Sequence, residues 1–465
     1  MKAVLLALAL ALSLGCAFGQ DITGDWHGML DIEGMKLRIV FHITSSAEGL
    51  TATFDSPDQG AFGIQVSRVA FTDPILILEM DTPPIIYTGE LKDEAISGTF
   101  SQSGYELPLD LRREAMEKPV YIRPQEPQEP FPYEVEELQF TNPEAGIKLS
   151  ATLTLPDKKG KHPAVILISG SGPQDRNEEL MGHKPFLVIA DHLTRAGIAV
   201  LRYDDRGFAA SEGDFASATT LDFASDAASA VRYLQSRPEI GRIGLAGHSE
   251  GGLIAPLVAG EIPELDFIVL LAGPGLRGDR LLLLQEELIW RVDEPDEAKI
   301  ERSLNINRNI FAMIMKEQDP EALTAQIREF LVQSVADGQV DIPEGYSEED
   351  VITQFIAQMT NPWMLFFIRH DPAPILEKVQ QPVLALIGSK DLQVPSRVNL
   401  EAIGAALDKA GNKNYELFEL DGLNHLFQQA ETGHPNEYAK IEQTIAPQAL
   451  NTMTRWIKEQ LGMEL

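Results

Sequence analysis

The sequence predicts an α/β architecture: a mostly parallel sheet of about eight strands, covered by helices and interrupted by a helical insertion, with a small antiparallel β domain in front of it. Two patterns carry this prediction. From residue 133 onward, apolar strand-like runs alternate with helical stretches, which is typical of a parallel sheet. Before residue 113, short apolar runs are separated only by turn residues, which is typical of antiparallel strands.

Composition and charge limit the class of protein. The chain has 465 residues, of which 44% are hydrophobic and 23% charged, the balance of an ordinary globular protein with a sizeable core. Its formal net charge of −32 repels phosphate backbones and anionic lipid surfaces. The sequence therefore argues against nucleic-acid binding, and its apolar runs are too short for a membrane span.

The N-terminus has the pattern of a secretory signal, a basic start followed by the short apolar run 3–14. We expect residues 1–19 to be a signal peptide cleaved after Gly19, so that the protein is exported to the periplasm or the medium. Cys16, the only cysteine, ends a loose lipoprotein-box pattern, and a lipid anchor at Cys16 stays open as the alternative. Neither outcome leaves a cysteine nucleophile.

Residues 20–113 are predicted to form the small antiparallel β domain. Runs such as 37–43 and 75–79 lie between Gly, Pro, Asp and Ser turns, which favours a sandwich or a barrel. Residues 114–132 are predicted to be a linker, because prolines spaced among Gln and Glu favour an extended polyproline segment.

Residues 133–465 are predicted to form the second domain, in which a hairpin precedes the parallel strands. The hairpin is expected at 133–140 and 147–155, and the strands at 164–168, 198–203, 243–246, 267–271, 383–387 and 415–420. The segment of about 274–372 is too long for a structureless loop and contains helical stretches. An insertion there lies over the carboxyl ends of the strands, where open α/β sheets bind ligands, so we expect a cap.

Gly247-His248-Ser249-Glu250-Gly251 fits the pattern G-x-S-x-G between the predicted strand 243–246 and the helical run 253–258. In that setting the serine occupies a strained strand-to-helix turn that points its hydroxyl into a site, and the glycines let strand and helix approach closely. We therefore predict that Ser249 is a nucleophile. For the motif alone, a glycine-rich turn without chemistry is the structural alternative.

A serine hydroxyl becomes a useful nucleophile beside a base, and the base needs a carboxylate to hold its tautomer. Asp391 follows one predicted strand and His425 follows the next. Alone, each has the ordinary interpretation of a turn, core or surface residue. With Ser249 they stand in the order Ser, Asp, His, each at the carboxyl end of a strand, so we predict a catalytic triad. His434 is the alternative base.

The oxyanion formed by serine attack needs two N–H donors. One is predicted from the backbone of Glu250, the residue after the nucleophile. The second is expected in Gly170-Ser171-Gly172-Pro173, the loop after an early strand, with Gly172 as the first choice and Ser171 as the second. A glycine-rich turn that merely ends the strand is the alternative.

Cofactor chemistry finds no support in the sequence. It has no H-E-x-x-H pattern, and its nine histidines are scattered without metal-ligand spacing. A P-loop and a dinucleotide-binding fingerprint are also missing. We predict neither a metal nor an organic cofactor.

Six segments taken together resemble the α/β-hydrolase superfamily, in the branch of bacterial exported esterases and serine aminopeptidases. They are Gly170 to Arg176, Tyr203 to Gly207, Gly247 to Gly252, Leu271 to Gly275, Asn361 to Trp363 and Gly422 to His425. The resemblance covers the chain from about Tyr133 to its end. It implies the α/β-hydrolase fold and hydrolysis of small-molecule carboxylic esters or, less often, of peptide or amide bonds, without a cofactor.

The residues and the resemblance together predict a serine hydrolase for carboxylic esters with short acyl chains, since a cap limits the acyl pocket and the negative charge opposes a lipid interface. An exported aminopeptidase or amidase is the alternative within enzymes. A binding module, whose β domain recognises a glycan, a peptide or a partner, is the alternative of another class. Near the oxyanion loop, an internal Asp–Arg interaction among Gln174, Asp175 and Arg176 is expected to brace the loop, and contact of these residues with substrate is the alternative. Asp205 and Arg206 are expected to act as scaffold.

Overall fold

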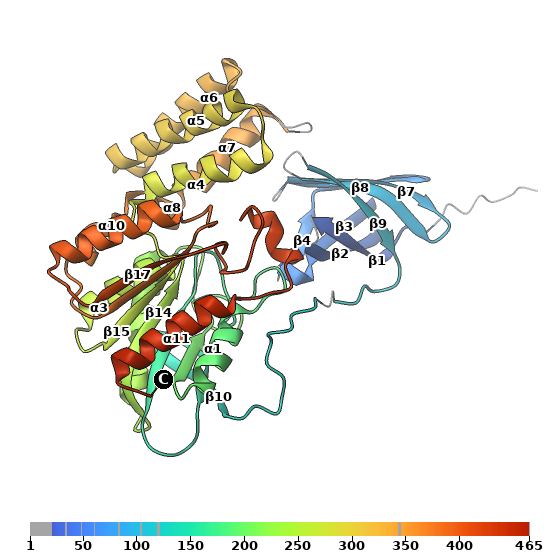
Figure 1. The fold of residues 1–465 in the computed structure, drawn as a ribbon. Coiled ribbons are helices and arrows are strands. Elements are labelled where there is room, and N and C mark those ends of the chain that lie inside the picture. Colours follow the sequence, from blue (N-terminus) through green and yellow to red (C-terminus); the bar gives the residue numbers. More distant parts are fainter. Residues whose placement is uncertain are drawn as a thin grey trace, which may run out of the picture. The chain divides into compact units, whose positions relative to one another are not determined.

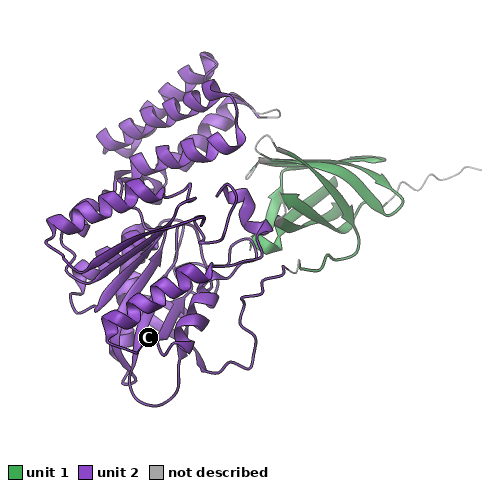
Figure 2. Cartoon of the chain, viewed as in Figure 1, with its two compact units in different colours: residues 1–119 green, residues 120–465 purple. Residues whose placement is uncertain are grey.

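The computed structural model describes residues 21–464 apart from 33–34, 48, 60, 82–83, 103–104, 119–120 and 343–345. The predicted signal segment 1–19, with Cys16, lies outside the described residues. The chain divides into two compact units, Met1–Pro119 and Val120–Leu465 (Figure 2). Throughout the described ranges, no helix is both long and apolar enough to span a bilayer.

The first unit is a single sheet that is antiparallel throughout, in the order β4-β3-β2-β1-β9-β8-β7-β6-β5 (Figure 1). Its strands are β1 (Gly24–Ile32), β2 (Met35–Ser46), β3 (Gly49–Ser56), β4 (Ala61–Val66), β5 (Arg68–Thr72), β6 (Ile75–Asp81), β7 (Pro84–Lys92), β8 (Ala95–Gln102) and β9 (Tyr105–Arg112). Although they are not neighbours in the sheet, β3 contacts β5 and β4 contacts β6. The sheet therefore curls until its two ends meet, as in a barrel.

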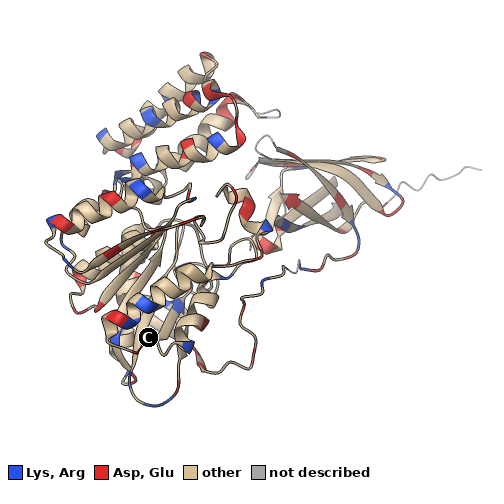
Figure 3. Cartoon of the chain, viewed as in Figure 1, with Lys and Arg blue, Asp and Glu red and all other residues tan. Residues whose placement is uncertain are grey.

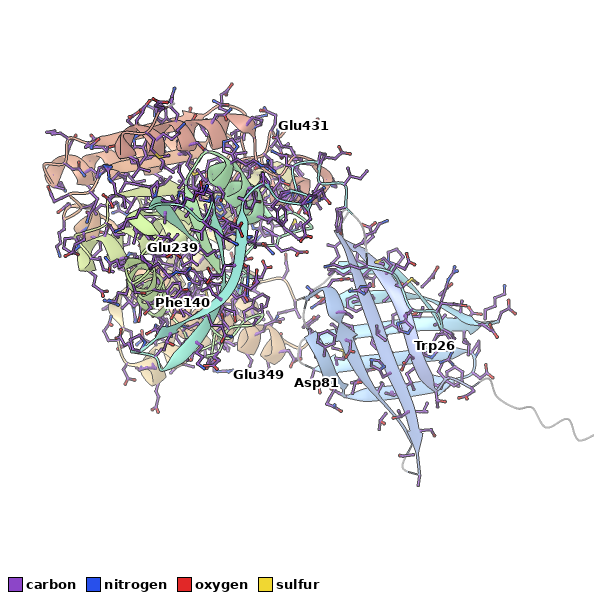
Figure 4. The ribbon with its side chains drawn as sticks, turned by 90° about the horizontal axis from the view of Figure 1, so that it is seen from below. Trp26, Asp81, Phe140, Glu239, Glu349 and Glu431 are labelled. Atoms are coloured by element: carbon purple, nitrogen blue, oxygen red, sulfur yellow. The ribbon has the colours of Figure 1, made fainter. Side chains whose placement is uncertain are left out.

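Alternating apolar residues fill the inside of this curled sheet. Along β6, for example, every second residue is buried. Trp26, labelled in Figure 4, is 1% exposed, and the rings of Phe41 and Tyr87 lie 5.7 Å apart. The Tyr87 hydroxyl donates to the backbone oxygen of Leu109 at 3.1 Å, which satisfies the polar end of a buried ring. The aromatic side chains thus form the core of this unit.

The second unit is built on an eight-stranded sheet in the order β10-β11-β13-β12-β14-β15-β16-β17. Its strands are β10 (Glu134–Asn142), β11 (Ile147–Leu155), β12 (His162–Ile168), β13 (Ala199–Tyr203), β14 (Ile240–His248), β15 (Phe267–Leu271), β16 (Val383–Gly388) and β17 (Tyr415–Leu420). The hairpin β10–β11 and the pair β11–β13 are antiparallel, and the other pairs are parallel. This is the order of the predicted α/β-hydrolase fold, in which β13 lies between β11 and β12 although it follows β12 in the chain.

Helices cover both faces of the second sheet, which explains why its strands are continuous apolar runs. Val165 and Leu167 on β12 belong to the core under α1 and α11, while their neighbours Ile166 and Ile168 belong to the core under α2, α3 and α10. Burying each such side chain contributes about 2 kcal/mol. These helices are α1 (Pro185–Arg195), α2 (Thr220–Gln235), α3 (Gly251–Glu261), α10 (Ser396–Lys409) and α11 (Pro447–Leu461).

A helical insertion lies between β15 and β16, where the cap is predicted, and it is called the cap from here on (Figure 1). It consists of α4 (Gly278–Asp293), α5 (Glu297–Lys316), α6 (Pro320–Ala336), α7 (Glu348–Thr360) and α8 (Pro362–Arg369), and the short α9 (Ala373–Leu376) leads back to the sheet. The cap has a core of its own around Ile310 and Ile327. Leu281 on α4 and Phe367 on α8 belong instead to the core of the sheet, so these two helices join the cap to the sheet.

Candidate active site

Ser249 stands in the turn between β14 and α3 with a φ of 51°, in the left-handed region that a residue with a side chain rarely occupies. Its backbone N–H donates to the oxygen of Leu271 at 2.8 Å, which holds the turn against β15. A Cβ at Gly247 would lie 1.9 Å from the Gly251 oxygen, and one at Gly251 would lie 2.2 Å from the Ile168 oxygen. Only glycine fits at both positions, so the sequence pattern corresponds to a strained strand-to-helix elbow.

Asp391 and His425 form a buried pair. Asp391 follows β16, His425 follows β17, and Oδ2 of Asp391 lies 2.8 Å from Nδ1 of His425. The other carboxylate oxygen accepts the backbone N–H groups of Gln393 and Val394 at 2.9 and 2.8 Å, which fixes the orientation of the carboxylate. We assign the ring proton to Nδ1, because a carboxylate oxygen accepts there, and this leaves the lone pair on Nε2 to act as a base.

The loop that carries His425 is held by Asn424. The Asn424 side-chain oxygen accepts the backbone N–H groups of Leu426 and Gln428 at 3.1 and 2.9 Å, and its amide donates to the Gln428 side chain at 2.9 Å. Asn424 is fully buried, so these bonds form away from water. They give the loop a defined shape on either side of the histidine.

The elbow lies next to both the His425 loop and the loop after β12. His248, the residue before Ser249, places Nε2 at 3.0 Å from the backbone oxygen of His425, and the two imidazole rings are 4.9 Å apart. On another side, a Cβ added to Gly170 would lie 3.2 Å from Cβ of Ser249. The structure thus brings together the serine, the Asp–His pair and the glycine loop at the carboxyl ends of the strands.

The glycine loop after β12 contains two of the predicted oxyanion donors, Gly172 and Ser171, and its neighbouring residue Gly170 can be compared with them. The backbone N–H of Gly170 donates to Oε1 of Glu178 at 2.9 Å and is therefore engaged. Ser171 is exposed, and Gly172 has a φ of 88° with open space where a Cβ would stand. The backbone of Glu250 stands at the N-terminal end of α3 in helical conformation. Gly172, Ser171 and Glu250 remain the predicted donors.

Arg176 braces the glycine loop, but through a different aspartate than its sequence neighbour. Its Nε and Nη2 donate to the two carboxylate oxygens of Asp204 at 2.9 and 2.8 Å. Asp175 instead accepts the backbone N–H groups of Asn177 and Glu179 and closes its own turn. The expected interaction within Asp175 and Arg176 is therefore replaced by a longer-range pair with Asp204, the residue that follows β13.

Asp205 and Arg206 lie beneath the loop as structural groups. Asp205 accepts the Ser169 hydroxyl at 2.7 Å and the Gln174 backbone N–H at 2.9 Å, and burial raises the pKa of its carboxyl well above the ordinary value. Arg206 binds the buried carboxylate of Asp226 through Nε and Nη2 at 2.7 and 2.9 Å. Both residues hold backbone segments that surround the site.

The side chain of Glu250 connects the elbow to the cap. Its Oε1 accepts the Thr220 hydroxyl at 2.6 Å and the indole N–H of Trp363 on α8 at 2.8 Å. Glu250 is 2% exposed, and burial raises the pKa of its carboxyl to about 7 against the effect of these two bonds. The residue predicted to give an oxyanion N–H through its backbone therefore also anchors the cap through its side chain.

His434, the alternative base, is engaged elsewhere. Its Nδ1 accepts the backbone N–H of Asn436 at 3.1 Å, and its Nε2 lies 3.0 Å from Asp293 at the end of α4. The histidine that Asp391 contacts is His425. The geometry favours His425 over His434 as the base.

Two further residues at the site, Glu178 and His248, were not predicted. His248 is inside the G-x-S-x-G motif but occupies a variable position, and nothing in the local sequence marks Glu178. In the part of the chain that the structure describes, no group of three or more His, Cys, Asp or Glu side chains gathers as a metal site.

Comparisons with known proteins show which families and proteins the chain is similar to. Residues 184–296 match the family model described as serine aminopeptidase, S33. Esterase EstD of Thermotoga maritima is 26% identical over 313 residues, which cover 66% of this chain and 65% of the esterase. The chain thus matches somewhat less than two thirds of the length of that relative.

Two solved structures with a partly similar chain trace are esterases. Est1E of Butyrivibrio proteoclasticus, solved with ferulic acid bound, has 20% identity and a TM-score of 0.40, and the match covers 70% of this chain and 99% of that one. An esterase of Pyrococcus furiosus has 17% identity and a TM-score of 0.44, over 71% of this chain and 92% of that one. The predicted resemblance to α/β-hydrolase esterases and serine aminopeptidases is thus confirmed: residues 184–296 match the S33 family model, and the chain is similar to esterase EstD.

Proposed function

We propose that this protein is a serine hydrolase that cleaves carboxylic esters through an acyl-enzyme intermediate. One observation carries the proposal: Ser249 stands in a strained, left-handed elbow, and its neighbour His248 contacts the backbone of His425, the partner of the buried Asp391. A strained elbow costs free energy, and such strain is typically kept where chemistry needs it.

In the proposed reaction, Nε2 of His425 takes the proton of the Ser249 hydroxyl while the serine oxygen attacks the ester carbonyl. Asp391 holds the imidazole and stabilises the imidazolium. Backbone N–H groups of Glu250 and of Gly172, or Ser171, stabilise the oxyanion. The C–O bond to the alcohol breaks as the alcohol takes the proton from His425. Water then attacks the acyl carbonyl while His425 takes its proton, and the bond to Ser249 breaks as the serine oxygen recovers that proton and the acid is released.

The cap and the charge favour small substrates over lipid surfaces. The helices α4 to α8 form an insertion between β15 and β16, and a cap of this kind restricts the length of acyl chain that reaches the serine. The ribbon carries both signs of charge over each unit (Figure 3), but acidic residues dominate and the chain has a net charge of −32. That charge opposes binding to anionic membranes. We infer a preference for short-chain esters.

An aminopeptidase is the second candidate, favoured by the match to the S33 family model. Amide cleavage needs His425 to protonate a departing amine, and an aminopeptidase also needs a carboxylate for the ammonium group of its substrate. Glu250, the acidic residue next to the nucleophile, already accepts bonds from Thr220 and Trp363. These contacts favour the ester reaction.

The test compares kcat/KM for acetyl, butyryl and palmitoyl p-nitrophenyl esters with that for aminoacyl anilides. We expect the acetyl or butyryl ester to lead. An anilide in the lead would replace the esterase by the aminopeptidase, and a palmitoyl ester in the lead would contradict the short-chain preference. Ser249→Ala serves as the control for hydrolysis outside the site.

A further inference from the structure

Three segments that carry the proposed chemistry converge on one buried imidazole–carboxylate pair. Oε1 of Glu178 accepts the backbone N–H of Gly170 at 2.9 Å and lies 2.9 Å from Nδ1 of His248. On the other side of the ring, Nε2 of His248 lies 3.0 Å from the backbone oxygen of His425. A continuous chain of hydrogen bonds therefore connects the oxyanion loop, the elbow and the backbone of the base.

This pair is closed off from solvent. Glu178 is 4% exposed and His248 is 7% exposed, and a small apolar cavity lined by Phe186, Leu271 and Phe427 adjoins them. In such surroundings a hydrogen bond is strong when it is made, and an unpaired polar group is costly. Glu178 also has a φ of 53°, so its backbone stands in a left-handed conformation that the rest of the loop must hold.

The protons of His248 follow from its neighbours. A backbone carbonyl only accepts, so Nε2 carries a proton, and Nδ1 faces a carboxylate oxygen. Burial acts to lower the pKa of His248, but the charge and hydrogen bond of Glu178, the His425 carbonyl and the charge of Asp391 outweigh it and raise the pKa. His248 therefore keeps both ring protons most readily while Glu178 balances its charge.

We propose that Glu178 and His248 are positioning residues for ester hydrolysis, which hold the oxyanion loop and the backbone of His425 in register with Ser249. The proposal rests on the function proposed above. Neither side chain is assigned a step in bond making. Their role is to fix the distances between the serine, the base and the oxyanion donors, on which turnover depends steeply.

An amide in place of the Glu178 carboxylate breaks this arrangement without changing its size. Glutamine carries no charge to balance a doubly protonated His248, so the ring keeps a single proton in Glu178→Gln. A ring with one proton loses a donor either to residue 178 or to the His425 carbonyl. His248→Leu removes both donors at similar volume, whereas the amide N–H of His248→Gln can still donate to the His425 carbonyl.

The experiment measures kcat and KM with a butyryl ester, and the rate and final stoichiometry of fluorophosphonate labelling, in these three variants. We expect full final labelling of Glu178→Gln and His248→Leu, with labelling rate and kcat about 10- to 100-fold lower than in the wild type. We expect KM within about 3-fold of the wild type and recovery of most of kcat in His248→Gln. A loss of packing alone would lower the folded fraction and the final labelling, not kcat per labelled site.

His162→Gln is the matched control, because His162 also faces a carboxylate, with Nε2 3.4 Å from Oδ1 of Asp157, but stands at the start of β12, away from the carboxyl ends of the strands. We expect it to keep the wild-type kcat. A wild-type kcat in fully labelled Glu178→Gln overturns the positioning role. If His248→Leu does not fold, the isosteric variant Glu178→Gln is sufficient to test that role. Ser249→Ala separates the two levels: if it retains wild-type turnover, the proposed function itself has failed.

Discussion

At the scale of single residues, Glu250 makes the stability of the protein depend on pH. Because burial raises its pKa to about 7, the folded protein keeps the Glu250 proton at pH values where the unfolded chain, with an ordinary value of 4.5, has released it. The stabilisation that the folded protein gains from holding this proton is complete below about pH 4.5 and is lost as pH rises through about 7. The difference amounts to roughly 3 kcal/mol.

We expect Glu250→Gln to remove this dependence. The glutamine oxygen can accept the same bonds from Thr220 and Trp363, and it has no proton to lose. The measurement is urea unfolding at pH 5 and pH 8. The free energy of unfolding of the variant minus that of the wild type should be higher at pH 8 than at pH 5 by up to about 3 kcal/mol. The exposed Glu264→Gln should change stability by less than about 0.5 kcal/mol at both values. If the unfolding free energy of Glu250→Gln depended on pH as steeply as that of the wild type, Glu250 would not be the source of the dependence.

At the scale of elements, α8 is the joint between the cap and the elbow. Asn361 caps the helix by accepting the backbone N–H of Met364 at 2.8 Å, and Pro362 suits its first position. One turn apart, Trp363 and Phe367 stack with ring centroids 5.0 Å apart. Phe367 is part of the sheet core and Trp363 bonds to Glu250, so the helix is fixed at two points.

Trp363→Phe should keep the ring stacking and delete the N–H that Glu250 accepts. We expect a loss of about 1–3 kcal/mol in unfolding free energy, because a buried acceptor loses a partner. The loss should be greater at pH 8 than at pH 5, since the ionised carboxylate is the stronger acceptor.

Trp290→Phe is the control for Trp363→Phe, because Trp290 is a half-buried cap residue whose ring lies 5.6 Å from the Lys299 ammonium. We expect it to lose about 1 kcal/mol or less, and equally at both pH values. Circular dichroism can follow unfolding without relying on tryptophan fluorescence. Equal losses at pH 5 and pH 8 for Trp363→Phe would argue against an ionising partner.

At the scale of the whole molecule, the features that the sequence predicts are those with a local pattern. The features that it does not predict depend on contacts between residues far apart in the chain. The strands of the second unit are continuous apolar runs, and the glycines around Ser249 mark the elbow, so both are visible in the sequence. Glu178 lies 70 residues before His248, and Trp363 lies 113 residues after Glu250. No periodicity or motif links the two members of either pair, and only the folded chain brings them together.

The first unit shows the same limit. Alternation of apolar residues predicts its antiparallel strands, but sandwich and barrel share that pattern. The contacts of β3 with β5 and of β4 with β6, which close the sheet, depend on its curvature. A binding role for this unit stays the alternative hypothesis.

The central claim is that Ser249 is the nucleophile of this hydrolase, and the most direct measurement is the site of covalent fluorophosphonate labelling. Peptide mass spectrometry of the labelled wild type should find one label per chain, on Ser249. Ser249→Ala should keep its circular dichroism spectrum, take no label and lose nearly all turnover, leaving a residual acceleration on the order of 10³- to 10⁴-fold over water. A label on another residue, or a folded Ser249→Ala variant with wild-type ester hydrolysis, would contradict the claim.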